Sequence, residues 1–81
     1  MDVRSQVRDF VTTNFYVPDP AQLKDEDSLL DLGIVDSTGV LELIGFLEEQ
    51  YAIEVADAEM VPENLDSIAR LVDFVGRKKP G

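Results

Sequence analysis

Cysteine and histidine are both absent from the 81 residues of this chain. Without cysteine the chain can form neither disulfides nor thiolate metal sites, and nothing indicates an oxidising compartment. Without histidine it lacks the commonest general base and the commonest metal ligand. These absences exclude a Ser-His-Asp hydrolase and zinc sites of the usual kinds.

Long apolar runs are absent as well. No stretch approaches the roughly 18–20 apolar residues that a membrane-spanning helix needs. The N-terminus, Met1 to Arg4, is not followed by the apolar run of a secretory signal. We therefore expect no membrane insertion and a cytoplasmic location. The length suffices for one domain, which we expect to span residues 1–81.

Positive charge is scarce. Seven Lys and Arg stand against 17 Asp and Glu, for a net charge of −10. Such a chain will not bind nucleic acid by neutralising phosphates, and an anionic membrane would repel it. Its natural partners should present basic patches, which speed encounter. The competing interpretation is that the acidity only keeps the protein soluble.

Apolar residues recur at helical spacing in three segments. We expect helices over residues 3–15, 37–50 and 67–77, each preceded by an aspartate that can cap its first turn, namely Asp2, Asp36 and Asp66. Gly39 and Gly45 lie inside the second helix, where each costs about 1 kcal/mol relative to alanine. These glycines can mark surfaces that something approaches closely.

The intervening segments show little regular pattern. Residues 16–36 read as a long loop that ends in a turn at Gly33, with a short helical turn possible over 29–32 and three leucines, at 29, 30 and 32, to anchor it in the core. Residues 52–55 read as a linker that buries Ile53 and Val55. A short turn over 57–60 is expected to end before Pro62. The prediction is an all-α bundle of three main helices and one short helix, with a long loop between the first two.

The stretch from Leu32 to Ser37 places a serine hydroxyl at the start of the second helix. The unpaired N–H groups and the positive end of the helix dipole favour an anion there. A phosphate esterified to Ser37 would therefore be well placed, with any attached arm projecting from the bundle. Asp36-Ser37 by itself is also an ordinary helix start.

A wider pattern resembles the acyl carrier protein family, including the peptidyl and aminoacyl carriers. The residues that carry this resemblance extend over nearly the whole chain, from about Val3 to Val75: Asp27-Ser28-Leu29, Leu32-Gly33, Asp36-Ser37, Val40-Leu41-Glu42-Leu43-Ile44, Leu47-Glu48-Glu49, Ile53-Glu54-Val55 and Leu65-Asp66-Ser67-Ile68. The resemblance implies a small four-helix acyl-carrier-like bundle.

The resemblance also implies roles. Ser37 would receive 4′-phosphopantetheine from coenzyme A through a phosphopantetheinyl transferase, and Asp36 matches the acidic residue that helps this enzyme recognise its target. Three glutamates of the second helix match positions that meet basic patches on partner enzymes, namely Glu42, Glu48 and Glu49; the alternative is a solvated helix face.

Placement beside Ser37 adds three residues to this set. Ile34, Val35 and Thr38 flank the serine, so we expect them to be partly exposed and to contact partners or the cargo.

The chain departs from the family pattern at four places. Thr38 stands where most members have leucine, Gly45 where a bulky apolar residue is usual, and Gly39 where a polar residue is common. The spacing between Gly33 and Asp36, filled by Ile34-Val35, is one residue longer than in the fatty-acid-synthesis type. The Gly-Ile-Val-Asp-Ser form looks more like freestanding carriers of D-alanylation, nonribosomal peptide or polyketide pathways than a housekeeping fatty acid carrier. The implied partners are a cargo-loading ligase or acyltransferase and a downstream synthase or transferase. The carrier itself would be a non-catalytic monomer.

Three other interpretations compete with a carrier. An acidic interaction module that never takes the arm would not need Ser37. A calcium site formed by Asp25, Asp27 and Asp31 fails on spacing, because leucines fall where oxygen ligands and glycine are needed. An enzyme is disfavoured, since a bundle this small is expected to have no obvious pocket and no nucleophile–base pair is present.

Overall fold

The computed structural model describes residues 2–78, which form an all-α fold, as the sequence predicts. Its α-helices and two short 3₁₀ turns are, in chain order, α1 (Val3–Asn14), η1 (Pro20–Gln22), α2 (Ser37–Tyr51), η2 (Asp57–Glu59), α3 (Pro62–Leu65) and α4 (Ile68–Lys78). No helix among these residues is long and apolar enough to cross a membrane.

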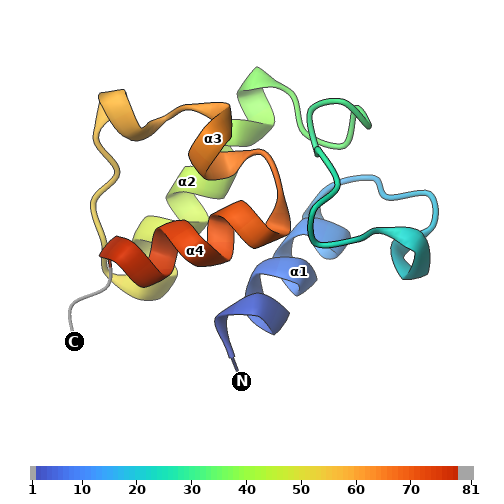
Figure 1. Cartoon of the computed structure of the whole chain (residues 1–81), viewed down its shortest axis with the longest axis horizontal. Helices are drawn as coiled ribbons and strands as arrows, with labels where there is room; N and C mark the ends of the chain where they lie inside the picture. The colour runs from blue at the N-terminus through green and yellow to red at the C-terminus, as the bar shows by residue number, and fades with distance from the viewer. Residues whose placement is uncertain (1, 79–81) are drawn as a thin grey trace.

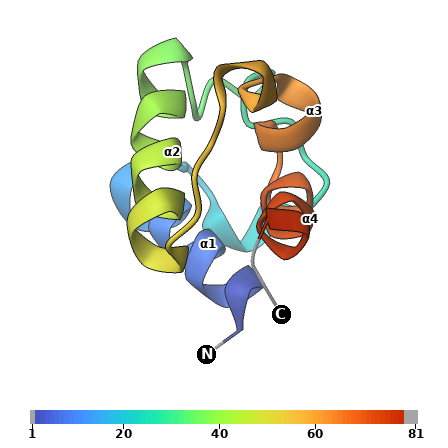
Figure 2. The same cartoon turned by 90° about the vertical axis from the view of Figure 1, so that its left-hand side faces the viewer.

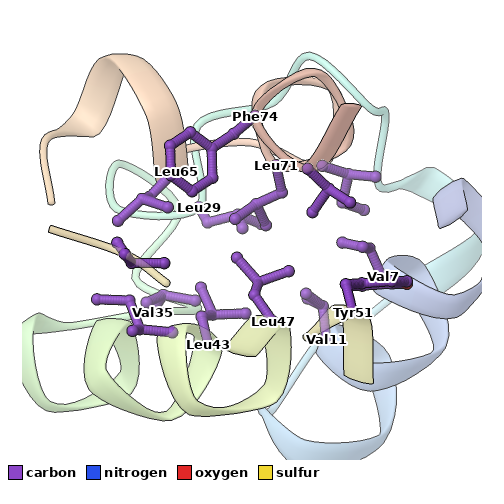
Figure 3. Close-up of a cluster of buried hydrophobic side chains, with 14 of the residues drawn as sticks. Val7, Val11, Leu29, Val35, Leu43, Leu47, Tyr51, Leu65, Leu71 and Phe74 are labelled. Atoms are coloured by element: carbon purple, nitrogen blue, oxygen red, sulfur yellow. The ribbon is translucent and has the colours of Figure 1, made fainter. Parts of the chain in front are cut away.

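The core lies between α2 on one side and α3 and α4 on the other, while α1 packs across one end (Figures 1 and 2). Figure 3 shows Leu43 and Leu47 of α2 pointing toward Leu71 and Phe74 of α4. All four side chains are at most 1% exposed. No helix could bury its apolar stripe alone, so the packing of these faces on one core holds the bundle together.

Helix α1 forms where Asp2 can cap it. The Asp2 carboxylate accepts a hydrogen bond from the Ser5 amide at 2.7 Å, as expected for an N-cap. Phe10, on this helix, stacks on Phe46 of α2 with ring centroids 4.2 Å apart. Tyr51 closes the far end of α2 by donating its hydroxyl to Gln6 at 2.8 Å, and burial raises the pKa of this phenol.

The long segment after α1 is held by α1 itself. Arg8 donates to the carbonyl oxygens of Pro20 at 2.6 Å and Leu23 at 2.7 Å, and the Asp25 carboxylate accepts from Arg4 and Arg8. These hydrogen bonds hold in place a segment for which the sequence shows no regular pattern. The segment includes the turn η1. Asp25 thus serves an internal contact.

Only one of the three loop leucines anchors the segment. Leu29 is 1% exposed, whereas Leu30 is 38% and Leu32 56% exposed, so the expectation that all three reach the core is wrong for the last two. The chain turns immediately after Leu29, with Gly33 at φ +71°, a conformation that favours glycine. Residues 29–33 form turns, and the Leu32 amide donates to the Ser28 carbonyl oxygen at 3.0 Å, which fits the short helical turn considered for 29–32.

Asp66 does not cap α4, contrary to expectation. Ser67 does so: its hydroxyl accepts the Arg70 amide at 3.0 Å. The Asp66 carboxylate instead accepts from the Ser28 hydroxyl at 2.6 Å and from the Leu30 amide at 2.9 Å. Asp66, whose position in the sequence suggests a role only in the helix that follows it, therefore ties the loop to the α3–α4 corner.

The linker after α2 buries Ile53 and Val55, as expected, and the Glu48 carboxylate accepts the Val55 amide at 3.0 Å. Pro62 begins α3 instead of only ending the turn, because proline suits a first helical position that needs no N–H partner. Lys78 pairs with Glu59 at 2.9 Å, and this contact lowers the pKa of the Glu59 carboxyl. The sequence places the run Arg77, Lys78 and Lys79 toward the C-terminal end of the last helix, where the helix dipole favours cations, and Lys79 of this run lies outside the described residues.

Candidate functional site

Ser37 is the first residue of α2 and is exposed. Asp36 precedes it as the N-cap, and its Oδ1 accepts the Gly39 amide at 2.8 Å while its carbonyl oxygen accepts the Val40 amide at 2.9 Å. The serine hydroxyl thus lies at the positive end of a 15-residue helix, open to solvent. This arrangement fits a phosphate ester on Ser37.

A chain of backbone hydrogen bonds sets the position of this helix start. The Leu29 amide donates to the Asp66 carbonyl oxygen at 2.7 Å. The Leu29 carbonyl oxygen accepts in turn from the amides of Ile34 at 3.0 Å and Val35 at 3.2 Å. Residues 34 and 35, immediately before the cap, are therefore tied to the α3–α4 corner through Leu29.

Val35 is 3% exposed and packs in the core, so the expectation that it is partly exposed is wrong. The side chain packs beneath the first turn of α2, where a Cβ at Gly39 would lie 3.2 Å from its Cγ1, so it cannot meet a partner. Ile34 is half-buried and Thr38 is exposed, as expected. Alternation at a loop-to-helix junction puts one of two adjacent apolar residues inside, and the sequence does not show which one.

Gly39 is buried in the first turn of α2. A Cβ placed there would lie 2.8 Å from Phe15 Cε1 and 3.2 Å from Val35 Cγ1. The aromatic ring thus packs against the backbone of the helix start, which only glycine permits without a shift. This is the close approach that the sequence indicates for Gly39.

The three glutamates of α2 are all exposed. Within residues 2–78 none of them forms an ion pair, although Glu48 uses one oxygen to bind the linker. The helix carries no Lys or Arg. Glu42 and Glu49 are thus available for an outside cation, while Glu48 also has a structural role.

An apolar cavity of about 380 Å³ opens beside Ser37. Its walls come from the loop, α2, the segment after η2 and α3, and include Leu29, Val40, Met60 and Leu65, with Asp66 at its edge. The expectation of no obvious pocket is therefore wrong. The sequence could not show it, because two stretches that are distant in the chain, residues 29–40 and 60–66, form the walls together.

The acidic loop is used internally. Asp27 accepts the Lys24 amide at 2.9 Å, and Asp25 is paired with Arg4 and Arg8. Among residues 2–78 no group of three acidic side chains is arranged to hold a metal ion. Asp25 and Asp27 therefore stabilise the folded loop through contacts within the chain.

Comparison with known proteins gives one family and several relatives. A family model described as a phosphopantetheine attachment site matches residues 5–75. An acyl carrier protein of Campylobacter curvus is 41% identical over 76 residues, which cover 93% of this chain and 94% of that protein. A D-alanyl carrier protein of Streptococcus gordonii is 32% identical over 75 residues, covering 93% and 92%.

A solved structure shares the fold. One chain in a crystal structure described as that of an FAD-dependent dehydrogenase superposes with a TM-score of 0.74 at 25% identity. The match covers 85% of this chain and 97% of that chain, so the matched chain is itself of this size.

Proposed function

The chain belongs to the carrier-protein family defined by the phosphopantetheine attachment site, and we propose that it carries an acyl or aminoacyl group on a 4′-phosphopantetheine arm attached to Ser37. The observation that carries the proposal is the exposed hydroxyl of Ser37 at the start of α2, inside the matched region. Asp36 caps the same turn and would help a transferase recognise it.

The attachment is a phosphoryl-group transfer from coenzyme A. The Ser37 oxygen forms a bond to the phosphorus that bears the pantetheine, the bond from that phosphorus to the bridging oxygen of the pyrophosphate breaks, and the nucleotide bisphosphate leaves. The serine proton goes to a base of the transferase, since this chain has no histidine to accept it. The chain presents the hydroxyl; the N-terminus of α2 stabilises the phosphodiester charge.

Once attached, the arm supplies the thiol that this cysteine-free chain lacks. The chain itself is a non-catalytic carrier: the tether raises the concentration of the cargo at each partner's active site. A phosphopantetheinyl transferase, a loading ligase or acyltransferase and a downstream synthase or transferase would dock through basic patches. The negative charge of the chain supports such brief electrostatic encounters.

For the pathway, we propose a freestanding single-domain carrier, residues 1–81, that works as a monomer in the cytoplasm. D-alanylation, nonribosomal peptide or polyketide assembly fits better than housekeeping fatty acid synthesis, because of the Gly-Ile-Val-Asp-Ser form and the D-alanyl carriers among its relatives. Relatives named acyl carrier protein keep an acyl cargo within the proposal. The cavity beside Ser37 offers apolar space to a short cargo.

The test is the intact mass after incubation with coenzyme A, magnesium and a broad-specificity phosphopantetheinyl transferase. We expect one phosphopantetheine on the wild type, one on Thr38→Ala, which removes the neighbouring hydroxyl, and none on Ser37→Ala. An unmodified, folded wild type would contradict the proposal and favour an acidic interaction module. Modification of Ser37→Ala would move the site elsewhere.

A further inference from the structure

Asp66 brings a single charge to the cavity beside Ser37. Among the described residues it is the only ionisable one that lines this cavity. Apart from the Ser37 hydroxyl, the other lining side chains are apolar, with Val40 and Leu65 among them. The cavity therefore combines an apolar interior with one carboxylate at its edge.

This carboxylate has no cationic partner within the part of the chain that the structure describes. The ion pairs there use Asp25, Asp73 and Glu59, but not Asp66. The groups that donate to the Asp66 carboxylate, the Ser28 hydroxyl and the Leu30 amide, are both neutral. A half-buried negative charge beside apolar surface is less well solvated than one in water, so an incoming cation would be favoured there.

The Asp66 carboxylate also has acceptor capacity left and is held in place. A carboxylate offers about four lone-pair sites on its two oxygens. Ser28 uses Oδ2 and Leu30 uses Oδ1, so each oxygen can accept a further hydrogen bond. The Asp66 carbonyl oxygen accepts the Leu29 amide at 2.7 Å as well. Because these three bonds already order the residue, a ligand would lose little entropy in binding it.

The lining distinguishes between classes of cargo. A plain acyl group would match the apolar walls, but it would displace water from Asp66 and offer the carboxylate no donor. An aminoacyl group would offer both an apolar side chain and an ammonium, which has three donors and a positive charge. A volume of about 380 Å³ suits a small group of this kind.

We propose that the cargo on Ser37 is an aminoacyl group whose ammonium binds the Asp66 carboxylate while its apolar side chain lies in the cavity. The inference rests on the proposed function and names the class of cargo. Ser37 lines the same cavity, so a cargo tethered to it remains near Asp66 at high effective concentration. Asp66 is then a residue that selects the cargo and takes no part in the chemistry.

The test compares two amide-linked cargos that differ by one ammonium, valyl and 3-methylbutanoyl, each attached from its coenzyme A analogue by a broad-specificity phosphopantetheinyl transferase. NMR titration of the ¹⁵N-labelled valyl amine gives its pKa. This pKa should be about 1 higher on the wild type than on Asp66→Asn, because a nearby carboxylate favours the charged form of the amine. Asparagine keeps an oxygen acceptor at this position but removes the charge.

Glu63→Gln is the matched control. Glu63 is an exposed carboxylate on α3 that does not line the cavity, so its loss should leave the pKa of the valyl amine at the wild-type value. Equal pKa values on the wild type and Asp66→Asn would overturn the proposal. An equal fall in Glu63→Gln would do so too, because the amine would then respond only to the overall charge.

A second measurement needs no variant. The Leu30 amide binds the same carboxylate, so in the wild type its NMR resonance should move more with the valyl cargo than with the 3-methylbutanoyl cargo. Equal movement with both cargos would overturn the ammonium site. Failure of the proposed function is a different result: neither cargo would attach, and intact mass would show this before any titration.

Discussion

At the scale of single residues, the start of α2 shows how close packing restricts side-chain choice. Phe15 and Val35 crowd Gly39 from two sides, while Gly45, less than two turns further on, faces open space. A side chain larger than hydrogen is therefore crowded at position 39 and has open space at position 45. Replacements of the two glycines should change stability in opposite directions.

Gly39→Ala should lower the free energy of unfolding by about 1 kcal/mol, because the strain of a 2.8 Å contact outweighs the gain in helix propensity. Gly45→Ala should raise it by up to about 1 kcal/mol, since alanine is the better helix former and meets nothing there. Urea unfolding of both variants measures the difference. Stabilisation by Gly39→Ala would show that the Phe15 ring moves aside at no cost.

At the scale of elements, α2 is positioned by segments remote from it in sequence. The Asp66 carboxylate accepts hydrogen bonds from the Ser28 hydroxyl and the Leu30 amide, and the Asp66 backbone carbonyl accepts the Leu29 amide. The Leu29 carbonyl in turn accepts the amides of residues 34 and 35, which precede the α2 cap. The α3–α4 corner thus sets where the loop ends and where Ser37 begins its helix. The stability of the loop should depend on this corner.

Ser28→Ala should lower the free energy of unfolding by about 1–2 kcal/mol, because it removes a 2.6 Å bond to a carboxylate and the acceptor of the Asp31 amide. Asp66→Ala should cost at least as much, since it also leaves the Leu30 amide without that acceptor. The double variant should cost less than the sum of the two, because they share one hydrogen bond. Strict additivity in denaturant unfolding would mean that the bond contributes nothing.

At the scale of the whole molecule, excess negative charge dominates. The net charge is −10, and several of the few cations already bind within the chain, among them Arg4 and Arg8 at Asp25, Arg77 at Asp73 and Lys78 at Glu59. The remaining carboxylates repel one another across a small molecule. Ion pairs near the protein surface contribute little in return.

Raising the ionic strength from about 0.01 M to about 1 M should therefore raise Tm, because the screening length falls from about 30 Å to about 3 Å. Thermal unfolding followed by circular dichroism at several NaCl concentrations measures the shift. Glu54→Lys, at an exposed linker position, changes the net charge from −10 to −10 + 2 = −8 and should gain less from salt. A fall in Tm with salt would mean that ion pairs outweigh the repulsion.

The local sequence was enough to predict the three long helices, the caps at Asp2 and Asp36, the turn at Gly33 and the burial of Ile53 and Val55, because hydrophobic period, capping and glycine conformation act over a few residues. The short helix α3 and the turn η1 were not predicted. The sequence also placed Ser37 at the start of a helix. Which of two adjacent residues, Ile34 or Val35, turns inward was decided only by tertiary structure.

Tertiary structure likewise decided that Asp66 binds the loop while Ser67 caps α4, that Leu30 and Leu32 stay outside the core, and that a cavity opens beside Ser37. Most of these features depend on groups far apart in the chain, such as Asp66 with Ser28 and Leu30, or on which side of a turn faces the core. Local periodicity carries no information on such pairings, since long-range packing and hydrogen bonding select among local alternatives that are nearly equal in energy.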